Sequence, residues 1–191
     1  NLLHVDLKLI TQLNNIDFSD CNFSGVDFAT VDLTGVNLTG ANLSHTNFYE
    51  ADLINAKLKN ANLTNANLTD AKLKNANLTN ANLTDANLSN ACLQGADLEG
   101  ANLTKAILTK ADLRNANLDN ADLTDATINR IHWRRLKINK IKNLPDKAYL
   151  VWQLMNLGRV NQDLSGVDLS DENLNYVNLE GANLTESNFR D

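Results

Sequence analysis

The chain has 191 residues, of which 43% are hydrophobic, 21% charged and 5% aromatic, and its formal net charge at pH 7 is −6. This length suits one domain or two small ones, and mild acidity promotes solubility without indicating a partner. No apolar run is long enough for a transmembrane helix. Two cysteines, Cys21 and Cys92, do not make a disulfide framework, and three histidines without clustered cysteines do not predict a metal site.

Residues 1–14 carry the least regular pattern of the chain. Val5 and Leu7 fit the spacing of a degenerate coil, whereas Leu3 and Leu7 also fit one face of a capping helix. We therefore expect either an N-terminal cap or a degenerate coil there. Because the sequence begins with Asn1 rather than Met, we also expect it to be part of a longer chain.

Residues 15–140 repeat with a period of five. A Leu or Phe recurs at every fifth position from Phe18 to Leu123, Ile128 continues the series, and the pattern degrades at Trp133 and Ile138. A small or β-branched residue such as Val26 or Ala41 lies two positions before each centre. A period of five matches neither a helix nor a flat strand. Each repeat is therefore predicted to be a short extended piece followed by a corner, and Gly, Asn, Asp, Ser and Thr fill the corner positions as turns require.

One column of the repeat is made almost entirely of asparagine. Residues 20 apart fall on the same face if each coil holds four repeats, and this column reads Asn22, Asn42, Asn62, Asn82, Asn102 and Asp122. Stacked asparagine side chains hydrogen-bond from one layer to the next in other stacked-strand structures. The column predicts a structural ladder and not a binding site.

The runs Ala61–Asn65, Ala66–Asp70 and Ala96–Gly100 resemble the pentapeptide repeat family, and the resemblance covers residues 16–140 and 162–191. It implies an all-β solenoid, a right-handed quadrilateral β-helix of about seven to eight coils in which neighbouring coils stabilise one another. It also implies a protein that is not an enzyme and holds no cofactor.

Residues 141–161 break the pattern and are predicted to be a loop and an α-helix inserted into one continuous domain. Pro145 and Gly158 mark the expected start and stop of the helix, and residues 162–191 resume the repeat with its phase shifted by one residue. One interpretation buries the helix on both sides. The other places an apolar surface on it for an unknown protein partner or a second copy, and its candidate residues are Leu150, Trp152, Leu154 and Leu157.

An uncapped C-terminal coil is the second route to a homo-oligomer, because open strand edges invite stacking.

Basic residues are concentrated between Arg130 and Arg159, where only Asp146 is acidic. The candidates for contacts with phosphates or anionic lipid headgroups are Arg130, Arg134, Arg135, Lys137, Lys140 and Lys142. The alternative is a solvated loop that pairs with nearby acidic corners. Nucleic acid is not expected as a partner, because aromatic residues do not alternate with these cations.

Catalytic residues are not predicted. Cys92, Asp112 and His132 are spaced 20 apart and resemble a nucleophile set, but an exposed flat wall offers no pocket that excludes water. They are interpreted as ordinary surface residues.

The resemblance implies a scaffold for protein–protein interaction, as a domain of a larger cyanobacterial protein that is membrane-associated or linked to heterocyst development. The bacterial cytoplasm is the expected location, with a membrane tether only through regions outside this sequence. The alternative is an acidic mimic of DNA that acts on DNA gyrase. The charge pattern disfavours it, because Lys57 and Lys72 interrupt the acidic columns.

Overall fold

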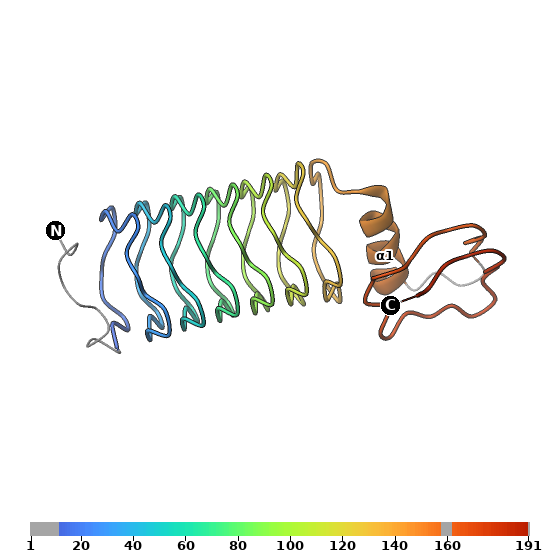
Figure 1. The fold of residues 1–191 in the computed structure, drawn as a ribbon, viewed down its shortest axis with the longest axis horizontal. Coiled ribbons are helices and arrows are strands. Elements are labelled where there is room, and N and C mark those ends of the chain that lie inside the picture. The colour runs from blue at the N-terminus through green and yellow to red at the C-terminus, as the bar shows by residue number, and fades with distance from the viewer. Residues whose placement is uncertain (1–11, 158–161, 191) are drawn as a thin grey trace.

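The computed structural model describes residues 12–157 and 162–190, so most of the predicted cap at residues 1–14 lies outside the described residues. Figure 1 shows a straight stack of similar coils, then one helix, then a smaller looped unit at the C-terminal end. We call the stack of residues 12–142 the β-helix and residues 162–190 the terminal unit. No helix in the described part of the chain is both long and apolar enough to cross a membrane.

Parallel bridges between residues 20 apart hold the β-helix together. They form four ladders, which begin at Gln12–Asp32 and end at Asp122–Lys142. The backbone nitrogen of Leu63, for example, donates to the carbonyl oxygen of Asn82 at 2.7 Å. Each coil therefore satisfies the backbone groups of the next, as adjacent parallel strands do.

The corners depend on a left-handed residue at every fifth position. Asn75 has a φ of 57°, and the nitrogen of Ala76 donates to the carbonyl of Leu73 at 3.0 Å. A positive φ at the third position with this hydrogen bond defines a type II turn. An Asn or Asp one position before the buried Leu or Phe supports many corners, as where Asn82 Oδ1 accepts from the backbone nitrogen of Thr84 at 3.1 Å. Asparagine suits both positions because it tolerates left-handed backbone and forms such local turns.

The core consists of stacked columns of Leu and Ala that are almost completely buried. Aromatic residues replace leucine near the N-terminal end, where the rings of Phe28 and Phe48 stack with their centroids 5.6 Å apart. Burial of these side chains is the main stabilising contribution, because no single repeat can enclose its own apolar face.

Helix α1, Asp146–Asn156, covers the C-terminal end of the β-helix (Figure 1). Its residues Ala148, Val151 and Leu154 are buried. The Trp152 indole nitrogen donates to the carbonyl of Leu136 at 2.9 Å, which ties the helix to the last complete coil. The helix thereby shields apolar side chains that a following coil would otherwise have covered.

The terminal unit packs beyond α1 and is held to both neighbours. Its own bridges join Asp163 to Asn183 and Asp168 to Asn188, which restores the spacing of 20 residues. An ion pair of 2.8 Å joins Arg130 of the β-helix to Asp171, and Lys147 of α1 donates to the carbonyl of Ser170. The three parts therefore meet at one junction.

Thr30→Asn is expected to stabilise the protein. Thr30 has a φ of 63° at a corner, where a β-branched side chain is strained and asparagine is not. Urea unfolding should show a free energy of unfolding about 1 kcal/mol higher than that of the parent. Thr109→Asn is the matched control, because Thr109 lies one position before a left-handed corner residue, and it should give no gain.

Candidate binding site at the C-terminal junction

The walls of the β-helix use most of their polar side chains for internal contacts. Asn42 Nδ2 donates to Asn22 Oδ1 at 3.2 Å, and Asn62 Nδ2 donates to Asn42 Oδ1 at 3.3 Å. The predicted ladder is therefore present in these coils. It changes at Asn82, whose amide donates to the hydroxyl of Thr64 at 3.1 Å, and that hydroxyl in turn donates to Asn62 Oδ1 at 2.7 Å.

Cys92, Asp112 and His132 do lie on adjacent coils, as the spacing predicts. The Asp112 carboxylate, however, accepts hydrogen bonds from Arg114 Nη2 at 2.6 Å and Gln94 Nε2 at 2.7 Å. Burial opposes its ionisation, but these hydrogen bonds outweigh burial and hold the pKa of Asp112 below its ordinary value. His132 Nδ1 is 4.0 Å from the carboxylate, which is already engaged by Arg114. The three residues do not form a nucleophile set.

The four candidate residues on α1 have different environments. Leu154 is 2% exposed. Leu150 and Trp152 are half-buried against the core, and Leu157 is 48% exposed. Most of the predicted apolar surface therefore faces the interior, because α1 packs between the β-helix and the terminal unit. Of the four, Leu157 is the most accessible to a partner, and Leu154 is not accessible.

The six candidate basic residues do not form one patch. Arg130 and Arg134 face the terminal unit, and Arg135 lines a shallow depression next to Arg134. Lys142 lies on another wall, 4.0 Å from Asp122. Lys137 and Lys140 are exposed on further faces of the β-helix.

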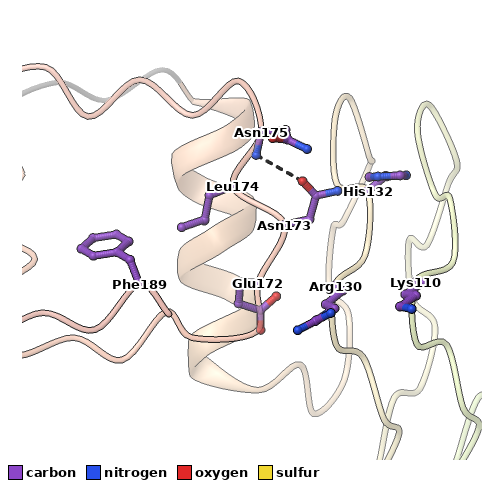
Figure 2. Close-up of a pocket in the computed structure, with 8 residues that line it drawn as sticks. All are labelled: Lys110, Arg130, His132, Glu172, Asn173, Leu174, Asn175 and Phe189. Atoms are coloured by element: carbon purple, nitrogen blue, oxygen red, sulfur yellow. Dashed lines mark hydrogen bonds between the residues drawn. The ribbon is translucent and has the colours of Figure 1, made fainter. Parts of the chain in front are cut away.

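A cavity of about 600 Å³ lies between the β-helix and the terminal unit, and we call it the junction hollow (Figure 2). Its lining residues are Lys110, Arg130, His132, Glu172, Asn173, Leu174, Asn175 and Phe189. A second cavity of about 230 Å³ shares His132, Asn173 and Asn175 with it. The two cavities therefore adjoin along the same face.

Two buried polar atoms at these cavities have no hydrogen-bond partner within the described residues. One is Oε2 of Glu172, whose side chain is only 4% exposed, and the other is the indole nitrogen of Trp133. Burial raises the pKa of Glu172 to about 7, although Lys147 at 4.0 Å opposes the rise. Such atoms are rare in folded proteins and call for an explanation.

An exposed aromatic residue lies beside the same cavities. Tyr176 is 87% exposed, and the guanidinium of Arg134 lies over its ring at 5.7 Å from the centroid. A cation over an aromatic face at this distance is a favourable contact that orients both groups.

Lys110, Glu172 and Tyr176 are the functional candidates that the sequence reasoning missed. Lys110 is 20 residues before Arg130, so it occupies the same corner one coil earlier. Glu172 stands two residues before Leu174, in the position that holds buried alanine in most repeats. That substitution is the signal that could have identified it. Tyr176 had no such signal.

The described residues offer no group of three His, Cys, Asp or Glu side chains that could hold a metal ion. The chemistry of the junction hollow is instead that of cations and amides beside one buried carboxyl group. Such an arrangement can bind an anionic group by ion pairs and hydrogen bonds.

Glu172→Gln is expected to remove a pH dependence of stability. The pKa of Glu172 is about 7 in the folded protein against an ordinary value of 4.5, so the carboxyl group loses its proton at a lower pH in the unfolded chain than in the folded one. Folded stability should therefore fall as pH rises from about 4.5 to 7, by up to about 3 kcal/mol.

Trp133 and Trp152 are the two tryptophans of the chain, and both lie at the junction, so tryptophan fluorescence during urea unfolding reports on it. The glutamine variant should show a smaller fall between pH 5 and 8. An equal fall in both proteins would contradict this assignment.

The family described as pentapeptide repeats matches the chain in 8 copies, over residues 11–48, 46–85, 61–100, 96–132 and 161–191. No curated protein matches it significantly. Among solved structures, HetL of the cyanobacterium Nostoc sp. strain PCC 7120, involved in heterocyst differentiation regulation, is 30% identical. That alignment covers 94% of this chain and 85% of HetL, with a TM-score of 0.29.

Two further solved structures are similar. Rfr23 of the cyanobacterium Cyanothece 51142 is 29% identical over 71% of this chain and 93% of its own, with a TM-score of 0.26. QnrB1, a plasmid-mediated fluoroquinolone resistance protein, is 16% identical over 91% of each chain, with a TM-score of 0.49. The repeat match, the ladders of bridges and the left-handed corners agree, and the chain belongs to the pentapeptide repeat family, whose fold is the right-handed quadrilateral β-helix.

Proposed function

We propose that this chain is a non-enzymatic scaffold that binds a protein partner through the face at its C-terminal junction. The observation that carries the proposal is the pair formed by Arg134 and Tyr176, in which the guanidinium lies over a ring that is 87% exposed. Tyr and Arg are the residue types that most often dominate the energy of protein interfaces. A pre-oriented pair loses less side-chain entropy when a partner binds.

The remaining surface supports this choice of face. Wall side chains such as Asn42 and Asn62 are engaged with neighbouring coils, so they offer fewer hydrogen bonds to a partner. The junction face instead combines cations, two cavities and the exposed ring of Tyr176. Large aromatic and cationic groups around a recess are typical of a specific binding surface.

Binding through a DNA-like acidic surface has less support. Lys72 lies 3.4 Å from Asp52 and neutralises one column, and Lys57 interrupts another between Asn37 and Asn77. In a supercoiling assay we expect no inhibition of DNA gyrase at micromolar protein. Inhibition at that concentration would instead favour the gyrase-directed alternative.

The broader setting stays a prediction. Membership of a larger cyanobacterial protein, membrane association and a link to heterocyst development come from the resemblance of the sequence alone. Assembly of two copies through the last coil also stays a prediction, and it draws some support from Leu184 and Phe189, which are 38% and 37% exposed.

Tyr176→Asn is expected to weaken partner binding about tenfold or more, the loss that truncation of an interface hot spot produces. Asparagine suits the left-handed backbone of Tyr176, whose φ is 72°. Proteins captured on the immobilised chain would be purified, and their dissociation constants measured against both forms.

The matched control is Tyr49→Thr, because Tyr49 is 39% exposed in an early coil and threonine occupies the same position in the next coil, at Thr69. The control should bind as the parent does. Equal affinity of all three proteins would overturn the assignment of the interface.

A further inference from the structure

We propose that the junction hollow and the smaller cavity beside it bind an extended acidic segment of the partner protein, and that a carboxylate of this segment lies between Lys110, Arg130 and Glu172. The inference rests on the proposed scaffold function and adds the chemistry of the partner. Its evidence is the shape of the site, its charge and its two unpartnered buried atoms.

The shape favours an extended ligand. The cavities of about 600 and 230 Å³ share His132, Asn173 and Asn175, so one segment can pass from one to the other. In Figure 2 the Asn173 side chain lies between His132 and the backbone of Asn175, whose nitrogen donates to Asn173 Oδ1 at 3.2 Å. Side-chain amides both donate and accept, which suits them to the alternating groups of a peptide backbone.

One side of the junction hollow is apolar. Leu174 and Phe189 project from the terminal unit on the side away from the β-helix (Figure 2). Phe189 is 37% exposed, so part of its ring remains available for contact. A ligand that fits this hollow therefore carries an apolar side chain next to its charged one, as alternating residues of an extended peptide do.

The opposite side is cationic. Lys110 and Arg130 occupy the same corner in successive coils, and His132 projects from the adjoining wall (Figure 2). Arg130 is paired with Asp171 at 2.8 Å, while no ion pair involves Lys110 among the described residues. The chain as a whole has a net charge of −6. This cationic face therefore attracts an acidic segment that other faces of the protein repel.

The two unpartnered atoms fit such a ligand. The Trp133 indole nitrogen is a donor, and the Glu172 carboxyl is a donor when it is protonated. Both atoms are covered in the free protein, so the side chains that line the cavities must shift before a ligand can accept their hydrogen bonds. A peptide carboxylate and a peptide carbonyl are acceptors for these two groups.

Glu172 also gives the site a pH dependence. The charged or titratable groups around it are Lys147 of α1, Lys110, Arg130 and His132 of the β-helix, and its neighbour Asp171. A ligand carboxylate beside Glu172 favours the protonated form of Glu172, so binding takes up a proton. Affinity should therefore fall as pH rises above neutrality.

The test uses fluorescence anisotropy with a labelled octapeptide of alternating Glu and Leu, and with a Lys and Leu octapeptide as the charge control. The acidic peptide should bind the full chain and the basic one should not. Lys110→Asn should weaken binding about fivefold, the effect of one exposed charge. Asparagine fits this corner because Asn90 holds the same position one coil earlier, with φ of 58° against 60°.

Lys105→Asn is the matched control. Lys105 is a corner residue of the same coil with a φ of 58°, but it lies outside both cavities. It removes the same charge and should leave binding unchanged. Equal weakening by both variants, or equal binding of the two peptides, would overturn the proposal.

A pH series separates Glu172 from general electrostatics. The affinity of the parent should fall several-fold between pH 6 and pH 8, up to the tenfold per pH unit that one coupled proton allows. Glu172→Gln should bind with a smaller fall, because glutamine does not titrate. The proposal fails if the two series are parallel.

Inorganic phosphate and free glutarate test whether a small anion is the ligand instead. Neither should displace the acidic peptide at equal concentration. If a partner binds through Tyr176 but the acidic peptide neither binds nor competes with it, the acidic-segment proposal fails while the scaffold function stands. If the peptide binds but no partner requires Tyr176, the scaffold function fails and the anionic site remains.

Discussion

The fold depends on the register of 20 residues between hydrogen-bonded coils. Because most of the backbone hydrogen bonds join residues about 20 apart on adjacent coils, a coil one residue longer would misalign all later ladders. The corners enforce this length, since each fifth residue must adopt left-handed backbone. Asparagine, aspartate and glycine occupy most of these corners for that reason. The short side chain of alanine then allows the walls to approach the central leucines closely.

The same register explains how the β-helix ends. Beyond Lys142 the repeat is out of phase, so another coil could not have continued the ladders. Helix α1 covers the exposed end instead, with Trp152 bonded to Leu136 and Asn156 bonded to Trp133. Covering an edge with a helix is one of the means by which proteins prevent further strand pairing. The change from coil to helix brings together side chains that do not repeat.

The proposed binding chemistry is concentrated where the repeat is interrupted. On the regular walls, stacked side chains satisfy one another, and even Asp112 is held by Arg114 and Gln94. At the junction the contacts are irregular, and Glu172 and Trp133 retain buried atoms without partners. Energetically incomplete sites of this kind are more often functional than fully satisfied ones. The rigid stack positions that face, and the terminal unit supplies its second side.

The sequence by itself determined the repeat, its corners and the family, because each of these depends on residues that recur at a fixed spacing. The asparagine ladder and the column of Cys92, Asp112 and His132 were predictable for the same reason. Only the tertiary structure decided how α1 packs, which basic residues meet, and that Glu172 lines one cavity with Lys110 and Arg130. These features rest on single contacts between non-repeating segments, such as Arg130 with Asp171, 41 residues apart. A periodic pattern contains no information about such contacts, since they are set by how three differently shaped parts fit together.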